Sequence, residues 1–229
     1  MYQELFFRNQ DALSKEEQGK LQNASIAIIG LGGTGGFALE NLLRVGVEDF
    51  ILFDGDRFEL SNMNRQTLCS IPALDQPKAE VAERRATEIN PSAKVERHAH
   101  FTAENMEELE RARIVLDCTD RAATHVAINE ACNAQRIPQV FATCNYSRGI
   151  VSVLENDELR KMLQLPQEKE KLGSYHQCTS ILAPAATIAG GLAAAQAMAY
   201  LLGKPYVHAP DVLMFDLFRE KMFWTERLE

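Results

Sequence analysis

One stretch of the sequence decides the fold: Ser25-Ile26-Ala27-Ile28-Ile29-Gly30-Leu31-Gly32-Gly33-Thr34-Gly35-Gly36. Its first five residues are mostly apolar and rich in β-branched side chains, which is typical of a short strand buried on both faces of a sheet. The glycines predict a tight turn after that strand, and apolar residues at helical spacing over 37–44 predict a helix after the turn. The stretch therefore predicts the first strand, turn and helix of an α/β domain.

Further units of the same kind follow along the chain. The helix predicted over 78–89 ends at Asn90, because the residue before a proline avoids helical geometry. Strands are predicted over 50–53, 94–98, 114–116 and 139–141, and helices over 78–89, 103–111 and 122–134. Strands that alternate with helices of this length form right-handed βαβ units. We expect a Rossmann-like α/β fold, with a mainly parallel twisted sheet and helices on both faces.

The last third of the chain has a different character. A strand is predicted over 149–154, and a closing antiparallel pair over 212–215 and 221–224. A polar stretch over 155–177 and an alanine-rich apolar stretch over 181–202 lie between them. The apolar stretch is long enough to span a membrane, but its weak hydrophobicity favours a buried, closely packed helix. We expect one domain over 1–229, with an antiparallel C-terminal extension and residues 155–178 as a mobile crossover insert.

Composition restricts the partners and the compartment. The chain has 24 Lys and Arg residues against 32 Asp and Glu, a net charge of −8, which argues against nucleic acid and anionic membrane surfaces as partners. Its N-terminal residues lack the basic and then apolar pattern of a signal peptide. The five scattered cysteines therefore indicate reduced thiols in the cytoplasm. No Cys-x-x-Cys pair occurs, so no structural zinc is expected.

The glycine-rich turn is a candidate phosphate site. Residues 32–35 would bring backbone N–H groups and the positive end of a helix dipole close to a phosphate. Asp54 follows the second predicted strand, where its carboxylate would accept hydrogen bonds from a ribose. Taken alone, this pattern fits any nucleotide, including those of dehydrogenases, and it also fits a turn needed only for packing.

Charged residues beyond the second strand favour ATP. Asp54, Asp56 and Arg65 follow that strand, and Lys78 begins a helix beside the same edge. A planar guanidinium holds two phosphate oxygens at once, which suits a triphosphate. Asp120 follows the strand over 114–116 and is placed to hold a hydrated Mg²⁺ on the phosphates. We expect ATP and Mg²⁺ as the cofactors.

With these residues in view, the sequence resembles the ThiF/MoeB/HesA family, the bacterial relatives of ubiquitin-activating enzymes. The resemblance rests on six motifs that span nearly the whole chain: Gly30-x-Gly32-Gly33-x-Gly35, Asp54-x-Asp56, Ser61-Asn62-x-Asn64-Arg65-Gln66, Gln76-Pro77-Lys78, Ile89-Asn90-Pro91 and Asp117-Cys118-Thr119-Asp120. It implies a homodimer that uses Mg·ATP to adenylate a carboxylate. In this family the carboxylate is typically the C-terminal glycine of a small ubiquitin-like sulfur carrier ending in Gly-Gly.

The resemblance also implies the residues of the site. Asp54 would bind the ribose, Arg65 and Lys78 the phosphates together with Asn62, and Asp120 the metal. The expected nucleotide-binding set is Gly32, Gly33, Thr34, Gly35, Asp54, Asp56, Asn62, Asn64, Arg65, Lys78, Asp120 and Arg121. Arg121 stands where family members commonly have asparagine, which would alter contacts to the adenine or to the acyl group.

Two more residues complete the expected catalytic set, each with a second interpretation. Arg8 matches a family arginine that crosses from the partner subunit to the β- and γ-phosphates; the alternative is an ordinary surface arginine. Cys178 matches a position where some members carry a cysteine that bonds to the activated carrier or relays sulfur; the alternative is a small unreactive residue at a turn, since adenylation itself needs no thiol. The catalytic set is then Arg8, Arg65, Lys78, Asp120 and Cys178.

Adenylation fits this set because the attacking carboxylate is already ionised at pH 7. The reaction needs no general base, only in-line positioning and neutralised phosphate charge. Many family members bind zinc through two Cys-x-x-Cys pairs; here the polar stretch over 155–177 replaces that region, as a loop over the carrier tail or as a solvated helix and loop.

The acceptor stays open between a protein carrier and a small-molecule or tRNA-borne carboxylate. Two different functions also fit the glycine-rich turn and the acidic residue after it. An NAD-dependent oxidoreductase would bind its cofactor there without any need for Lys78 or Asp120. A noncatalytic nucleotide-binding dimer would bind ATP without transferring it, which leaves the full set of charged residues unexplained.

Overall fold

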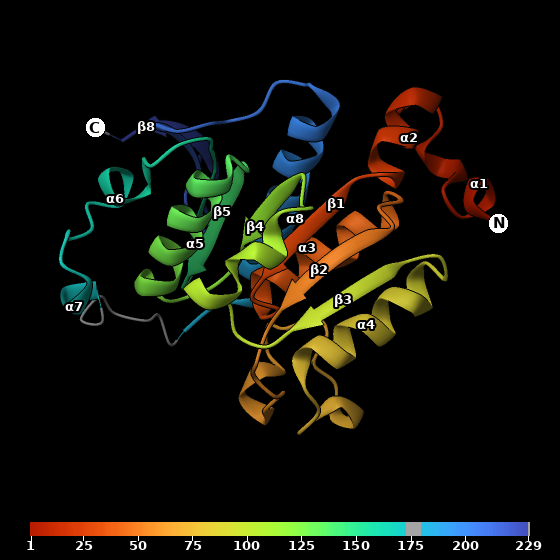
Figure 1. The fold of residues 1–229 in the computed structure, drawn as a ribbon, viewed down its shortest axis with the longest axis horizontal. Helices are drawn as coiled ribbons and strands as arrows, with labels where there is room; N and C mark the ends of the chain where they lie inside the picture. Colours follow the sequence, from red (N-terminus) through yellow and green to blue (C-terminus); the bar gives the residue numbers. More distant parts are fainter. Residues whose placement is uncertain (173–179, 229) are drawn as a thin grey trace.

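The computed structural model describes residues 1–172 and 180–228, and within them the strands form one eight-stranded sheet in the order β3-β2-β1-β4-β5-β6-β7-β8. Figure 1 shows this sheet running across the molecule. The strands are β1 (Ser25–Ile29), β2 (Asp49–Phe53), β3 (Lys94–His98), β4 (Ile114–Asp117), β5 (Gln139–Asn145), β6 (Arg148–Leu154), β7 (Asp211–Asp216) and β8 (Phe223–Arg227).

The five strands from β3 to β5 are parallel, as the alternation of strands and helices predicted. Their registers align the carboxyl ends, since Ile29 of β1 pairs with Phe53 of β2 on one side and with Asp117 of β4 on the other. The loops that leave these strands therefore meet at one edge of the sheet. Open parallel sheets bind ligands at this edge.

The strands from β5 to β8 are antiparallel, and β7 with β8 forms the closing pair that the sequence predicted. A short turn at Tyr146 and Ser147 joins β5 to β6, which is possible only between antiparallel neighbours. This hairpin extends the sheet without a crossover helix and brings its turn to the same edge as the ends of the parallel strands.

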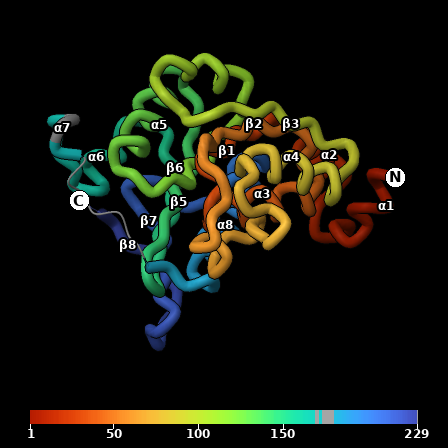
Figure 2. Tube along the Cα trace, turned by 90° about the horizontal axis from the view of Figure 1, so that it is seen from below, coloured from red at the N-terminus to blue at the C-terminus, as the bar shows by residue number. Residues whose placement is uncertain are grey.

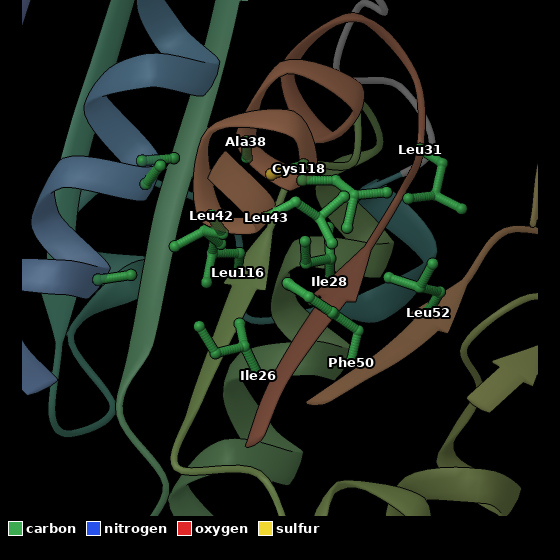
Figure 3. Packing of buried hydrophobic residues seen from close by; sticks show 14 of the residues in the cluster. Ile26, Ile28, Leu31, Ala38, Leu42, Leu43, Phe50, Leu52, Leu116 and Cys118 are labelled. Atoms are coloured by element: carbon green, nitrogen blue, oxygen red, sulfur yellow. The ribbon is translucent and has the colours of Figure 1, made fainter. Parts of the chain in front are cut away.

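Helices cover both faces of the sheet (Figures 1 and 2). Along β1, Ile26 and Ile28 face the large apolar cluster formed with α3 (Gly33–Arg44) and α4 (Lys78–Ile89). Ala27 and Ile29 face the cluster formed with α5 (Ala122–Gln135). Figure 3 shows the first cluster. The α-helices are α1 (Tyr2–Leu5), α2 (Lys15–Gln22), α3 (Gly33–Arg44), α4 (Lys78–Ile89), α5 (Ala122–Gln135), α6 (Leu159–Met162), α7 (Lys169–Leu172) and α8 (Ala183–Leu202), and the short 3-10 helices are η1 (Phe7–Asn9), η2 (Leu60–Asn62), η3 (Ile71–Ala73) and η4 (Ala103–Leu109).

The helix predicted over 103–111 is wrong in type, because the segment forms the 3-10 helix η4. Asn105 interrupts it with a non-helical backbone (φ −116°). The Asn105 side chain instead accepts a hydrogen bond from the Thr102 N–H at 2.8 Å. Asparagine competes in this way for backbone groups and weakens a regular helix.

The alanine-rich stretch forms α8, the one helix among the described residues that is long and apolar enough to span a membrane, with a mean hydropathy of 1.4. It packs against α3, β5 and β6, and eight of its residues are buried. At Gly190 a Cβ would overlap the Thr34 carbonyl oxygen and lie 2.6 Å from Phe37 Cβ. Small side chains therefore let α8 approach α3 closely, as the composition predicted.

Part of the expected insert over 155–178 packs onto the domain. Leu159, Met162 and Leu172 are buried in a cluster with Val126 of α5 and Phe141 of β5. These contacts place α6 and α7 beside α5 (Figure 1). Residues 173–178 of the insert, which include Cys178, lie outside the described residues.

The two adjacent glycines of α8 test this close packing. We expect Gly190→Ala to lower the free energy of unfolding by about 1–3 kcal/mol, because the added methyl overlaps α3. Gly191→Ala is the matched control: no atom lies within 4 Å of its Cβ position, so better helix propensity should raise stability by up to about 1 kcal/mol. Urea unfolding measures both, and equal effects would contradict the packing argument.

Candidate active site

A cavity of about 440 Å³ lies at the carboxyl ends of the parallel strands. Its walls come from the glycine-rich turn, the ends of β2, β4 and β5, and the starts of α4, α5 and α8. The lining residues are Ile29, Gly30, Gly32, Gly33, Thr34, Phe53, Asp54, Asp56, Arg65, Gln66, Lys78, His100, Phe101, Cys118, Thr119, Asp120, Arg121, Thr124, Thr143, Cys144, Ile181 and Ala186.

The glycine-rich turn places the start of α3 in the wall of this cavity. Gly30 has a φ of +90°, and a Cβ at Gly35 would overlap the Gly30 carbonyl group, so both positions require glycine. Gly32 is the N-cap of α3 and has no side chain to accept from the first backbone N–H groups of the helix. These donors and the positive end of the helix dipole provide an anion site.

Asp54 lies beside the turn, half-buried at the end of β2. Its carboxylate accepts hydrogen bonds from the Leu31 N–H at 2.7 Å and the Asp56 N–H at 2.9 Å. Burial raises the pKa of Asp54, although the charge of nearby Lys78 and these two bonds oppose the rise. The two backbone donors fix the carboxylate, and each oxygen keeps a lone pair with which to accept from a ribose hydroxyl.

Lys78 supplies a buried positive charge to the cavity. It is the first residue of α4 and is only 7% exposed, and its Nζ lies 3.2 Å from Asp56 Oδ2. Asp56 is itself well exposed, so water screens its charge. A buried ammonium with one weakly held partner favours the entry of another anion.

Arg65 adds a second cation. Its Nη1 donates to the Ser61 carbonyl at 2.9 Å and to Asn64 Oδ1 at 2.8 Å. Among the described residues, its Nε and Nη2 groups make no hydrogen bond. The guanidinium is thus fixed through Nη1, while its remaining N–H donors are available to a ligand.

Asp120 and Arg121 lie on the opposite wall, where β4 leads into α5. Both side chains are exposed, and within 1–172 and 180–228 neither makes a hydrogen bond or an ion pair. A free carboxylate facing an anion site is the oxygen donor that hydrated Mg²⁺ prefers. The donor set therefore fits a metal ion held between Asp120 and bound phosphates.

Three of the expected nucleotide-binding residues do not line the cavity: Gly35, Asn62 and Asn64. Asn62 is buried, and its Oδ1 accepts from the Glu59 N–H at 3.0 Å, which stabilises the turn that carries Arg65. Asn64 lines a neighbouring hollow instead of the cavity, and its amide donates to the Ile181 carbonyl. Both side chains thus support the loop around Arg65.

Arg8 lies at the opposite edge of the sheet from the cavity of its own chain. The neighbouring Asn9 donates to the Val45 carbonyl at 3.2 Å, and Tyr2 donates to the Gly46 carbonyl at 2.8 Å. Val45 and Gly46 link the end of α3 to the start of β2, whereas the cavity lies at the start of α3. The 12 residues of α3 separate the two edges by about 18 Å, and Figure 1 shows the N-terminus at the far end.

Several lining residues had no role in the sequence prediction. Phe53 and Phe101 are the buried aromatic residues of the wall, and such surfaces suit a flat base. Thr143 and Cys144 belong to β5. The rule that ligands bind at the carboxyl ends of parallel strands would have found these two residues, because β5 is the last parallel strand.

Cys118 and Cys132 are buried and belong to no disulfide. Burial raises the pKa of Cys118 well above its usual value, and the charge of Asp117 raises it further. Burial also raises the pKa of Cys132. Both thiols therefore stay protonated and act as packing residues.

A second hollow of about 520 Å³ adjoins the cavity. Arg65 and Ile181 line both spaces, so the two are neighbours. The wall of the second hollow combines exposed apolar side chains with hydroxyl and amide groups: Ser61, Asn64, Arg65, Tyr146, Ser147, Ser180, Ile181, Leu182 and Phe218. This composition suits an extended ligand that presents both apolar and hydrogen-bonding groups.

Comparison with known proteins agrees with the motifs, since the ThiF family model matches residues 7–228. The chain belongs to the ThiF family. A curated relative from Escherichia coli (strain K12), named sulfur carrier protein ThiS adenylyltransferase, is 33% identical over 212 residues and covers 90% of this chain and 83% of its own. The molybdopterin-synthase adenylyltransferase of the same strain is 30% identical over 210 residues, with 87% and 81% covered. The ThiF-family chain is thus an enzyme of the adenylyltransferase type.

Solved structures share the fold of this ThiF-family chain. E. coli MccB with ATP superposes with a TM-score of 0.78 at 21% identity, covering 93% of this chain and 66% of MccB. PaaA gives a TM-score of 0.78 at 20% identity, with 99% and 73% covered. At these identities the likeness supports the Rossmann-like architecture with its C-terminal antiparallel strands.

Lys78 provides a test of the anion site. We expect Lys78→Ala to weaken ATP binding at least tenfold, about 1.4 kcal/mol, because the buried ammonium faces the phosphates, and to leave adenosine binding nearly unchanged. Titration calorimetry measures both ligands. Lys94→Ala is the control, because Lys94 is exposed and lies at the amino ends of the parallel strands, away from the cavity. Equal losses of affinity for ATP and adenosine in Lys78→Ala would contradict this role.

Proposed function

We propose that this enzyme uses Mg·ATP to adenylate the C-terminal glycine carboxylate of a small ubiquitin-like sulfur carrier, with release of pyrophosphate. One observation carries the proposal. Lys78, Arg65 and the uncapped start of α3 converge with the free carboxylate of Asp120 on one cavity, and that cavity adjoins a hollow for the acceptor. A cluster of cationic groups and helix N–H donors in a protein of net charge −8 suits a polyanionic ligand.

Each residue of the cavity has its own role in this reaction. Asp54 orients the ribose and the start of α3 receives phosphate oxygens, while Lys78 and Arg65 neutralise the charge that builds on the leaving pyrophosphate. Mg²⁺, when bound through Asp120, would add further neutralisation of the phosphate oxygens. The attacking carboxylate is ionised already, so in-line positioning replaces proton transfer as the main requirement.

The second hollow supports an extended acceptor. Tyr146, Leu182 and Phe218 present exposed apolar surface, and hydroxyl and amide groups line the same hollow. A tail ending in two glycines is narrow and has free backbone donors and acceptors, so it matches such a passage toward Arg65. The names of the E. coli relatives, which specify a sulfur carrier protein and molybdopterin synthase, support a protein acceptor.

A tRNA-borne carboxylate is the second candidate acceptor. It is favoured by the Bacillus subtilis (strain 168) protein named tRNA threonylcarbamoyladenosine dehydratase, which is 32% identical over 138 residues, 59% of this chain and 54% of its own length. The acidic net charge of the chain argues against a large RNA footprint. Membership of an adenylyltransferase family argues against the oxidoreductase and the noncatalytic binding module.

We further propose a cytoplasmic homodimer in which Arg8 of one subunit completes the site of the other. Arg8 cannot reach the cavity of its own chain from the opposite edge of the sheet. A two-fold dimer would exchange the two N-terminal segments reciprocally. Cys178 lies outside the described residues, and the proposed adenylation requires no thiol.

Exchange of labelled pyrophosphate into ATP tests the reaction. We expect exchange with a carrier ending in Gly-Gly and not with small acids, and we expect Lys78→Ala and Asp120→Ala each to reduce it by at least 100-fold, because both act on the phosphates. Glu220→Ala, an exposed carboxylate that lines neither hollow, is the control. Exchange supported only by small acids would reassign the acceptor, and ATP binding without exchange would refute the activity.

Mixed dimers test the role of Arg8. Arg8→Ala and Lys78→Ala proteins should each be inactive alone. When their subunits are exchanged, one site per mixed dimer regains both groups, so activity should recover to about a quarter of wild type under random pairing. Absence of recovery, with mixed dimers verified by native mass spectrometry, would place Arg8 outside the partner's site.

A further inference from the structure

A buried carboxylate lies directly beneath the wall that carries Asp120. Asp117 ends β4 and is fully buried. Its Oδ1 accepts from the Thr119 hydroxyl at 2.8 Å and from the Thr119 N–H at 3.2 Å. Its Oδ2 accepts from His125 Nδ1 at 2.8 Å and from Gln139 Nε2 at 3.0 Å. A buried carboxylate requires such partners, because burial without them is strongly unfavourable.

The partners of Asp117 lie on both sides of Asp120 and Arg121 in sequence. Thr119 comes immediately before Asp120, and His125 lies in the first turn of α5, shortly after Arg121. The backbone N–H of His125 also donates to the Arg121 carbonyl at 3.0 Å. One carboxylate therefore anchors both ends of the segment 120–121, whose side chains face the cavity without contacts of their own among the described residues.

The network continues away from the cavity into the core. Gln139 Oε1 accepts from Asn129 Nδ2 at 2.9 Å, which links the start of β5 to α5. The His125 ring packs edge-on against Phe141 with a centroid distance of 5.0 Å. Both contacts restrict the rotation of the groups that hold Asp117, so the network is rigid on its inner side.

We propose that His125 and Asp117 are positioning residues that hold Asp120 where it binds the phosphate-bound metal. The inference rests on the proposed function, in which Asp120 faces Mg·ATP. Neither residue needs to contact the nucleotide. Loss of His125 Nδ1 would release the α5 end of segment 120–121 and reduce affinity for Mg²⁺, while binding of metal-free ATP would persist on Lys78, Arg65 and the start of α3.

The test is calorimetric titration of ATP, with EDTA and across a Mg²⁺ series, on the intact chain. We expect His125→Leu to raise, by about 10-fold or more, the Mg²⁺ concentration at which the gain in ATP affinity is half-maximal. This shift is toward the behaviour of Asp120→Ala, and the ATP affinity measured in EDTA should be unchanged. His125→Asn should restore the wild-type Mg²⁺ response, because its amide nitrogen is as many bonds from Cα as Nδ1. In the protein without nucleotide, hydrogen exchange at the backbone amides of residues 119–121 should be faster in His125→Leu and unchanged in His125→Asn.

Val126→Ala is the matched control: Val126 is the buried neighbour of His125 on α5 and has no polar side-chain group to offer Asp117. It should lower stability and leave the Mg²⁺ response unchanged. A wild-type Mg²⁺ response in His125→Leu would overturn the inference and leave the proposed function intact, as would an equal shift in Val126→Ala. A wild-type protein that fails to bind ATP would overturn the proposed function itself, and the inference with it.

Discussion

The rest of the structure depends on one constraint, which is that Gly30 and Gly35 in the turn after β1 have no side chain. A Cβ at Gly35 would overlap the Gly30 carbonyl, and one at Gly30 would lie 2.8 Å from the Cys118 carbonyl oxygen. Only because both are glycine does α3 begin against the ends of β1 and β4. That contact brings the start of α3, the Leu31 N–H that fixes Asp54, and the segment after β4 to one cavity.

The site also illustrates a balance between stability and ligand binding. Burial raises the pKa of Asp54, which the charge of Lys78 and two backbone donors offset only in part. The buried Lys78 ammonium has the exposed Asp56 as its one ion-pair partner among the described residues. Asp117, which is buried more deeply, has a full set of donors. For these charged residues, pairing is incomplete at the wall of the cavity and complete beneath it.

Much of the fold follows from the sequence, because buried parallel strands and amphipathic helices leave strong patterns. The predicted bounds of α4 and β3 are those observed, and the closing pair of β7 and β8 is confirmed. The type of η4 was missed, since one asparagine side chain decides it. In the site, no pattern distinguishes Asn62, which caps its own turn, from a residue that faces a ligand. The partners of Asp117 come from α5 and β5, and only the tertiary structure brings them together.

The close packing of α8 on α3 has a consequence for the synthesis of the chain. The ribosome completes α3 at Arg44 but does not complete α8 until Leu202. At about 5–20 residues per second, this leaves the apolar surface of α3 uncovered for roughly 8–30 s. The surfaces of α3, β5 and β6 that α8 covers in the finished domain therefore lack this helix until the last part of the chain is made.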